Sequence, residues 1–186
     1  MASPCWPLAS SLLILWSCGG KPSSGSSSSA PAKPVEITEA ESWDLADPGV
    51  DPFSSYATGR LRCTKADFRP EASWLEVTTT QCNYVTFVHQ LADAAAAGSV
   101  IRGQIAWATL AAIDPAVGTL AFADAAGTVL WSHDVPIPST SSLVNVEFEL
   151  SEAAAAGSSL FFHVRNHGYN SWQLSPLMLS PPDAKP

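Results

Sequence analysis

The sequence predicts an all-β domain, a sandwich or a barrel, that follows an export signal and a flexible tether. Only 14% of the residues are charged, and the body is rich in Ala, Val, Thr, Ser and aromatic residues, a profile that favours strands over helices. Short apolar runs alternate with turn signals at regular intervals. Within the segment 143–150, apolar and polar residues alternate from Val144 to Leu150, which predicts a strand with one buried and one wet face.

The first 17 residues are interpreted as a signal peptide. They contain no Asp, Glu, Lys or Arg, and their apolar run at 11–16 is too short to cross about 30 Å of hydrocarbon as a helix. Residues 15–18 (LWSC) resemble the lipobox of bacterial lipoproteins, which implies that Cys18 is lipidated and becomes the mature N-terminus. No aspartate stands directly after Cys18, so the resemblance points to an outer-membrane lipoprotein of the cell envelope. Whether the protein lies on the periplasmic or the surface face of that membrane is left open. Ordinary secretion is the alternative.

Two further segments precede the domain. Residues 18–34 combine the lipidated cysteine with a Ser, Gly and Pro tether that is too polar to order itself. Residues 35–58 form an acidic lead-in with six acidic residues and no basic one, in which Trp43 and Leu45 are possible anchors of an edge strand. The β-sandwich is assigned to residues 59–180, and residues 181–186 form a C-terminal tail.

The domain is expected to contain nine short strands. Their predicted ranges are 60–64, 73–79, 84–91, 99–110, 117–123, 128–133, 143–150, 159–167 and 171–179. The tetrapeptide DAAG at 124–127 predicts a hairpin turn, and Pro136 and Pro138 are expected to end the strand that follows it.

One segment occurs twice. Residues 91–99 (LADAAAAGS) and 150–158 (LSEAAAAGS) match at an offset of 59, and each precedes a strand. Alanine favours helices and glycine ends them, so each copy predicts one or two helical turns at the end of the sandwich. A chance repeat in an Ala-rich chain is the alternative. If the repeat is structural, residues 101–107 correspond to residues 160–166. The residues expected to point inward are then Ile101, Ile105 and Trp107 in the first strand and Leu160, Phe162 and Val164 in the second.

This layout of strands, repeated strand leads and a late aromatic and amide loop resembles a jelly-roll domain of the galactose-binding-like kind, found in many carbohydrate-binding modules. The resemblance covers about residues 60–180 and contains no diagnostic motif. It implies a jelly roll of eight or nine antiparallel strands with one or two short helical turns. It also makes carbohydrate the first ligand class to test, without catalysis.

The four cysteines divide into three groups. Cys5 leaves with the signal peptide, Cys18 is the lipidation site, and Cys63 and Cys82 remain in an oxidising compartment, where we expect them to form a disulfide. Closing that loop would stabilise the fold by roughly 3 kcal/mol. A metal site is the rival interpretation, but neither cysteine has a second cysteine or a histidine at ligand spacing.

Several functions lack support in the sequence. The net charge is −8 with nine basic residues and no basic cluster, which argues against nucleic acid. His163 and His167 lie roughly 13 Å apart on an extended strand, too far to share one metal ion. Glu147 and Glu149 alternate on a wet strand face, as ordinary surface residues do. Without a catalytic motif or a cofactor signature, we predict no metal and no cofactor. A small envelope hydrolase with scattered catalytic residues stays a minor alternative.

The candidate ligand site combines polar and aromatic residues from two aligned strands and the late loop. Rings of this kind stack on sugar C–H faces, while amide and guanidinium groups choose among hydroxyls. The candidates are Gln104, His163, Arg165, Asn166, His167, Tyr169, Asn170 and Trp172. The alternative makes Trp172 a core residue and Asn170 a turn residue, in a structural or protein-binding envelope lipoprotein. Trp74, Trp107 and Trp131 are assigned to the core.

Overall fold

The computed structural model describes residues 33–57, 59, 61–166 and 168–182, which form two antiparallel sheets. The seven-stranded sheet contains β1 (Val35–Glu36), β3 (Phe68–Glu71), β4 (Trp74–Thr78), β6 (Val100–Trp107), β9 (Ser142–Glu149), β11 (Ser171–Leu174) and β12 (Met178–Ser180). The five-stranded sheet contains β2 (Asp44–Leu45), β5 (Tyr84–Gln90), β7 (Ala116–Ala123), β8 (Val129–Ile137) and β10 (Ser159–Arg165). Three 3₁₀ turns, η1 (Ala40–Ser42), η2 (Ser54–Ala57) and η3 (Lys65–Asp67), are the helical elements of the described residues, and none is long and apolar enough to cross a membrane.

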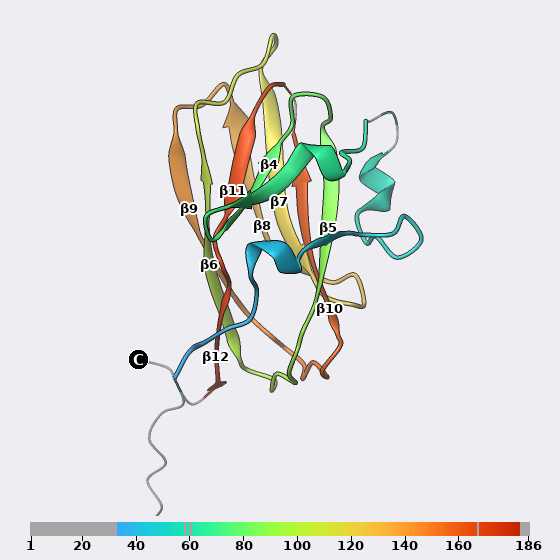
Figure 1. Ribbon diagram of the computed structural model, residues 1–186, viewed down its shortest axis with the longest axis vertical. Coiled ribbons are helices and arrows are strands. Elements are labelled where there is room, and N and C mark those ends of the chain that lie inside the picture. The colour runs from blue at the N-terminus through green and yellow to red at the C-terminus, as the bar shows by residue number, and fades with distance from the viewer. Residues whose placement is uncertain (1–32, 58, 60, 167, 183–186) are drawn as a thin grey trace, which may run out of the picture. The chain divides into compact units, whose positions relative to one another are not determined.

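The strand order is that of a jelly roll (Figure 1). One sheet contains the neighbours β4, β11, β6 and β9, and the other contains β5, β10, β7 and β8, with all these pairs antiparallel. Apart from the hairpin β7–β8, each step along these eight strands crosses from one sheet to the other, as two interlocked Greek keys require. The predicted jelly-roll sandwich is confirmed, with the short strands β1, β2, β3 and β12 added at its margins.

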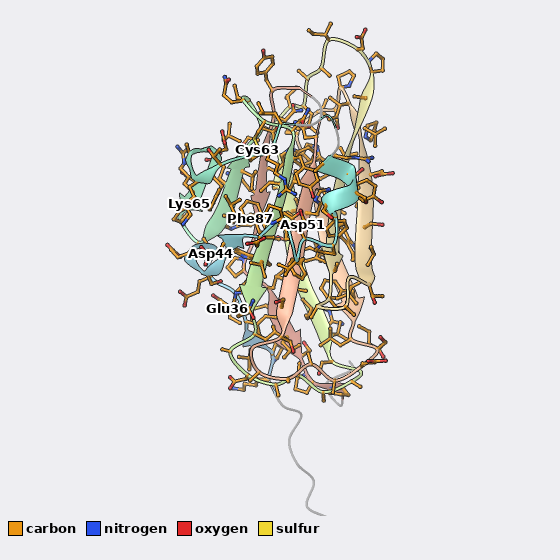
Figure 2. All side chains as sticks on the ribbon, turned by 90° about the vertical axis from the view of Figure 1, so that its right-hand side faces the viewer. Glu36, Asp44, Asp51, Cys63, Lys65 and Phe87 are labelled. Atoms are coloured by element: carbon orange, nitrogen blue, oxygen red, sulfur yellow. A yellow bond between two sulfur atoms is a disulfide. The ribbon has the colours of Figure 1, made fainter. Side chains whose placement is uncertain are left out.

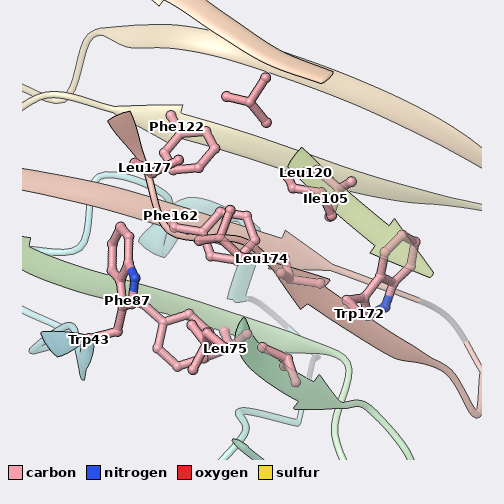
Figure 3. Packing of buried hydrophobic residues seen from close by; sticks show 14 of the residues in the cluster. Trp43, Leu75, Phe87, Ile105, Leu120, Phe122, Phe162, Trp172, Leu174 and Leu177 are labelled. Carbon is pink, nitrogen blue, oxygen red and sulfur yellow. The ribbon is translucent and has the colours of Figure 1, made fainter. Parts of the chain in front are cut away.

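A column of aromatic rings fills the space between the sheets (Figure 3). Phe162 of β10 stacks on Phe122 of β7 at 5.0 Å between ring centroids and lies 6.1 Å from Phe87 of β5. Trp43, from the acidic lead-in, approaches the same Phe162 ring edge-on at 6.1 Å. Burying each phenylalanine contributes roughly 1.5–3 kcal/mol. The predicted inward alternation of β9 is confirmed, since Val146 and Phe148 belong to this core.

The repeated segments 91–99 and 150–158 pair with each other. Ala95 and Ala154 form an antiparallel bridge in which each amide donates to the other's carbonyl at 2.8 Å. The glycine of each segment donates its amide to the leucine that begins the other, at 2.7 Å in both cases. The repeat is therefore structural, but the helical turns predicted here are wrong. Both segments are bends and turns, because their backbone groups bond across to the partner copy.

Three strand predictions need correction. Of the predicted strand 60–64, the described residues 61–64 contain only an isolated bridge at Arg62, and the next strand is β3. Pro136 does not end the strand but lies inside β8, which is an edge strand of its sheet, the usual place for a proline within a sheet. The last predicted strand is interrupted at 175–177, where Leu177 turns into the core. Gly103 makes room for it, since a Cβ there would lie 2.5 Å from Leu177 Cδ2.

The predicted disulfide between Cys63 and Cys82 is present, with 4.9 Å between the two Cα atoms. It ties the segment before η3 to the loop before β5. The predicted signal peptide, Cys18, almost all of the tether and the end of the C-terminal tail lie outside the described residues.

Candidate functional site

The structure does not bring the predicted ligand-site residues together. Gln104 is exposed on the outer face of the seven-stranded sheet, where its Nε2 donates to Asn145 Oδ1 at 3.2 Å. His163 and Arg165 lie on the outer side of the five-stranded sheet. The sequence repeat aligns Gln104 of β6 with His163 of β10, but these two strands belong to different sheets. Equivalent outward positions therefore point to opposite sides of the sandwich.

Two of the predicted rim residues instead hold the loop after β10. Asn166 is fully buried, and its Nδ2 donates to Thr79 Oγ1 and to the Gly168 carbonyl. Asn170 Nδ2 donates to Asn166 Oδ1 at 2.8 Å, and its own Oδ1 accepts the Ala111 amide at 2.8 Å. These bonds satisfy the backbone of a buried turn, which leaves both amides inaccessible to a ligand.

The aromatic rim residues are also separated. Trp172 is 0% exposed and packs beside Trp107 at 5.8 Å between ring centroids, within the core. Tyr169 is 69% exposed in the loop, and His167 lies outside the described residues. Trp107 is buried and Trp131 packs partly buried against the core, as assigned. Trp74 does not belong to the core as assigned: it is half-buried on the outer face of β4, at the start of the strand and just before the inward-facing Leu75.

The outer face of the five-stranded sheet forms a regular grid of side chains. Its first row runs across three strands, from Arg165 of β10 to Thr119 of β7 and Asp134 of β8. The second row contains His163, Ala121 and Ser132 in the same order. Rows lie two residues apart, roughly 6.8 Å along an antiparallel strand. The first row is polar, and the second has a small side chain at its centre.

A strap formed by residues 46–57 covers part of this face (Figure 2). Phe53 of the strap stacks on the His163 ring at 4.4 Å between centroids and belongs to a small buried cluster with Phe161, Ala121 and Ala123. The strap therefore has a hydrophobic contact of its own, separate from the main core. Its 3₁₀ turn η2 places Tyr56 at the border of the covered area, 47% exposed.

A groove of about 290 Å³ lies between the strap and the edge strand β8. Ala121 forms its floor, and the small side chain is what gives the groove depth. Its lining residues are Phe53, Tyr56, Thr119, Ala121, Val129, Ser132, Asp134, His163 and Arg165. We take this groove as the candidate functional site, since it combines an exposed aromatic ring, apolar walls and polar groups.

The first row of the grid provides the directional hydrogen-bonding groups of the groove. Arg165 Nη2 donates to Thr119 Oγ1 at 3.1 Å, and Thr119 Oγ1 donates to Asp134 Oδ1 at 2.8 Å. The Arg165 guanidinium carbon also lies 5.1 Å from the centroid of the Tyr56 ring. Arg165 forms no ion pair within the described part of the chain. Arg165 has further N–H groups and the exposed Asp134 has a second carboxylate oxygen, and both residues line the groove.

His163 supports the groove from below. It is 1% exposed, and its Nδ1 lies 3.0 Å from Thr86 Oγ1 on the neighbouring strand. The Tyr84 ring meets it edge-on at 5.0 Å, and Phe53 covers its other side. We therefore assign His163 to positioning the strap, since it is buried and Phe53 of the strap stacks on its ring.

A buried charged cluster anchors the start of the strap. Asp51 Oδ2 accepts the Tyr84 hydroxyl at 2.5 Å and Arg62 Nη2 at 3.1 Å. The Arg62 guanidinium also lies over the Tyr84 ring, 4.8 Å from its centroid. Burial, followed by the hydrogen bond to Asp51, raises the pKa of Tyr84 well above its usual value, so its hydroxyl stays protonated and keeps donating.

Seven of the nine groove residues were not among the predicted site residues: Phe53, Tyr56, Thr119, Ala121, Val129, Ser132 and Asp134. The structure places Thr119 opposite Asp134, but the predicted hairpin could not show this, because its second strand was expected to end at 133 and the pair contains a register shift between Phe122 and Ala123. No sequence pattern indicates that residues 46–57 fold back over the sheet, so Tyr56 could not have been found this way.

Glu147 and Glu149 lie outside the groove. Glu147 forms a two-point ion pair with Arg102, at 3.0 and 3.2 Å, on the outer face of the other sheet. No three side chains of His, Cys, Asp or Glu gather at metal-binding distance within residues 33–57, 59, 61–166 and 168–182.

No family model and no curated protein matches the sequence. Among solved structures, the K3 adhesin domain of Lys-gingipain from Porphyromonas gingivalis is similar, with 13% identity, 80% of this chain and 99% of that one covered, and a TM-score of 0.49. The C-terminal CBM6 of the laminarinase LamC from Zobellia galactanivorans is 15% identical, with 80% of this chain and 99% of that one covered and a TM-score of 0.44. The arabinose-bound arabinofuranosidase MgGH51 gives 13% identity and a TM-score of 0.40, and here 82% of this chain spans only 31% of that protein. These likenesses concern the fold, and the site has to be judged from its own residues.

Proposed function

We propose that this chain is a non-catalytic carbohydrate-binding protein whose ligand lies in the groove between the strap and β8. The observation that carries the proposal is the exposed Tyr56 ring beside the row Arg165, Thr119 and Asp134. The ring offers a flat apolar face to sugar C–H groups, and the row offers donors and acceptors to hydroxyls. Catalysis would need a matched acid and base facing each other, and the groove offers Asp134 as its one carboxylate.

The fold supports this proposal only as an analogy. Carbohydrate-binding modules of the galactose-binding-like kind are jelly rolls, but one fold serves many functions. The groove therefore carries the assignment, and its residues provide the test.

Export and lipid anchoring through Cys18 form part of the proposal. The apolar run, the LWSC sequence and the polar tether support it, and a disulfide fits an oxidising compartment. Expression in a bacterial host with a labelled fatty acid tests this part. Label is expected on the parent and not on the Cys18→Ala variant, and equal labelling of both would contradict the anchor.

A glycan array tests the binding function, with the full chain produced in an oxidising compartment. The parent should bind at least one glycan class, and Tyr56→Ala should weaken that binding at least tenfold. Tyr169→Ala is the matched control, because this tyrosine is also exposed and does not line the groove. Equal binding by parent and Tyr56→Ala would place the site elsewhere.

A second candidate function is binding of an envelope protein without a glycan. The observation in its favour is the exposure of Ile113 (96%) and Tyr169 (69%) on two loops joined by the hydrogen bond from the Ala111 amide to Asn170. A silent glycan array, together with a crosslinked partner that is lost in Ile113→Ser, would favour this alternative.

A further inference from the structure

We infer, on the premise that the groove binds carbohydrate, that it selects neutral glycans through a pair of neighbouring hydroxyls and discriminates against uronic acids and sulfated sugars. The feature behind this inference is the row Arg165, Thr119 and Asp134. It contains one guanidinium and one carboxylate that do not touch each other but meet through the threonine hydroxyl. The row therefore has no net formal charge.

The row is held ready for a ligand before binding. Thr119 uses its hydroxyl hydrogen for Asp134 and accepts from Arg165, so both charged groups are fixed relative to one another. The stacking of Tyr56 near the guanidinium limits the movement of Arg165 further. A ligand then pays little for ordering these side chains, which is the usual source of affinity in a small polar site.

A pair of sugar hydroxyls matches this row chemically. Each hydroxyl can donate and accept, so one can accept from the free N–H groups of Arg165 while its neighbour donates to Asp134. A carboxylate or sulfate can only accept. Placed on Arg165 it would also face the negative charge of Asp134 across one threonine, and like charges at such range disfavour each other.

The rest of the groove adds no positive charge. Its other lining residues are aromatic, aliphatic, hydroxyl or imidazole side chains, and the nearby Arg62 is already paired with Asp51. The chain as a whole carries a net charge of −8, which further repels a polyanion at low salt. Val129 and Tyr56 instead offer apolar contact along the groove walls.

The test is a titration of the full chain, by calorimetry, with two panels of oligosaccharides. The neutral panel contains β-glucan, xylan, mannan and galactan fragments, and the anionic panel contains oligogalacturonate, oligomannuronate and a sulfated galactan fragment. The variants are Arg165→Ala and Asp134→Asn. Glu149→Gln is the control with the same charge change, because Glu149 is exposed on β9 of the opposite sheet.

The expected result is that the parent binds a neutral oligosaccharide at least tenfold more tightly than every anionic one. Arg165→Ala should bind that neutral oligosaccharide at least tenfold more weakly than the parent does. Asp134→Asn should also bind it more weakly, and the ratio of its affinities for neutral and anionic oligosaccharides should be smaller than that of the parent. Glu149→Gln should change neither. Circular dichroism checks that each variant is folded.

Failure of the inference and failure of the proposed function give different results. Tight binding of an anionic oligosaccharide that is lost in Arg165→Ala would overturn neutral selectivity and leave the groove as the site. Binding that neither Arg165→Ala nor Tyr56→Ala affects would overturn the groove and the inference together. Binding of neither panel would overturn the carbohydrate function itself.

Discussion

Replacing Trp172 by alanine should remove a large part of the protein's free energy of unfolding. It should not act as a selective loss of ligand binding in a protein that stays fully stable. The ring is 0% exposed and lies against Trp107 in the core. Its fit is close on the other side too, since a Cβ at Gly118 would lie 3.0 Å from the ring. Truncating a buried tryptophan costs about 3–5 kcal/mol, a fifth or more of the roughly 5–15 kcal/mol that holds a domain folded.

Urea unfolding measures this loss as a lower midpoint with an unchanged slope. Trp172→Phe should cost less than the alanine variant, because the phenyl ring fills most of the space and the indole N–H has no hydrogen-bond partner among the described residues. Tyr169→Ala should stay within about 0.5 kcal/mol of the parent, since that side chain is exposed. A loss below about 1 kcal/mol for Trp172→Ala would refute the core assignment.

Three further perturbations test other parts of the structure. Gly103→Ala should cost about 1–3 kcal/mol in urea unfolding, because the added methyl displaces the buried Leu177. Since burial and a neighbouring carboxylate raise the pKa of Tyr84, the unfolded chain releases this proton at lower pH than the folded chain. The free energy of unfolding should therefore be insensitive to this group below about pH 9 and fall above about pH 10, and Tyr84→Phe should remove that part of the fall. Replacing Cys63 and Cys82 together by serine should lower stability by about 3 kcal/mol, and a variant as stable as the parent would contradict a structural disulfide.

The sandwich could be predicted because apolar and polar residues alternate with a period of two residues in a half-buried strand, a period that helices do not have. In β9 the apolar positions repeat every second residue, and the same positions lie in the core. The repeated segments show the limit of such local signals. Four alanines favour a helix, but residues 91–99 bond to residues 150–158 instead, and a pairing over 59 positions leaves no local trace.

The candidate site was less accessible to sequence reasoning because it depends on contacts between segments far apart in the chain. His163 and Arg165 lie on one outward face of β10, but the residues around them in the groove come from segments that the prediction did not include. Tyr56 reaches the groove only because the strap folds back over β10, held by Asp51 and Phe53. Conversely, a loop rich in Asn, Tyr and Trp suggested a ligand rim, whereas its amides bond to buried backbone groups and to each other.

The most direct test of the central claim is a nuclear magnetic resonance titration of the labelled protein with the best oligosaccharide from the array. Binding in the groove predicts amide shift changes concentrated at Thr119, Ala121, Ser132, Asp134 and Arg165, with saturation at a single affinity. Little change is expected for Gln104 and its surroundings on the opposite sheet. Changes concentrated on that opposite face, or in the loop at residues 168–170, would contradict the assignment of the groove as the ligand site.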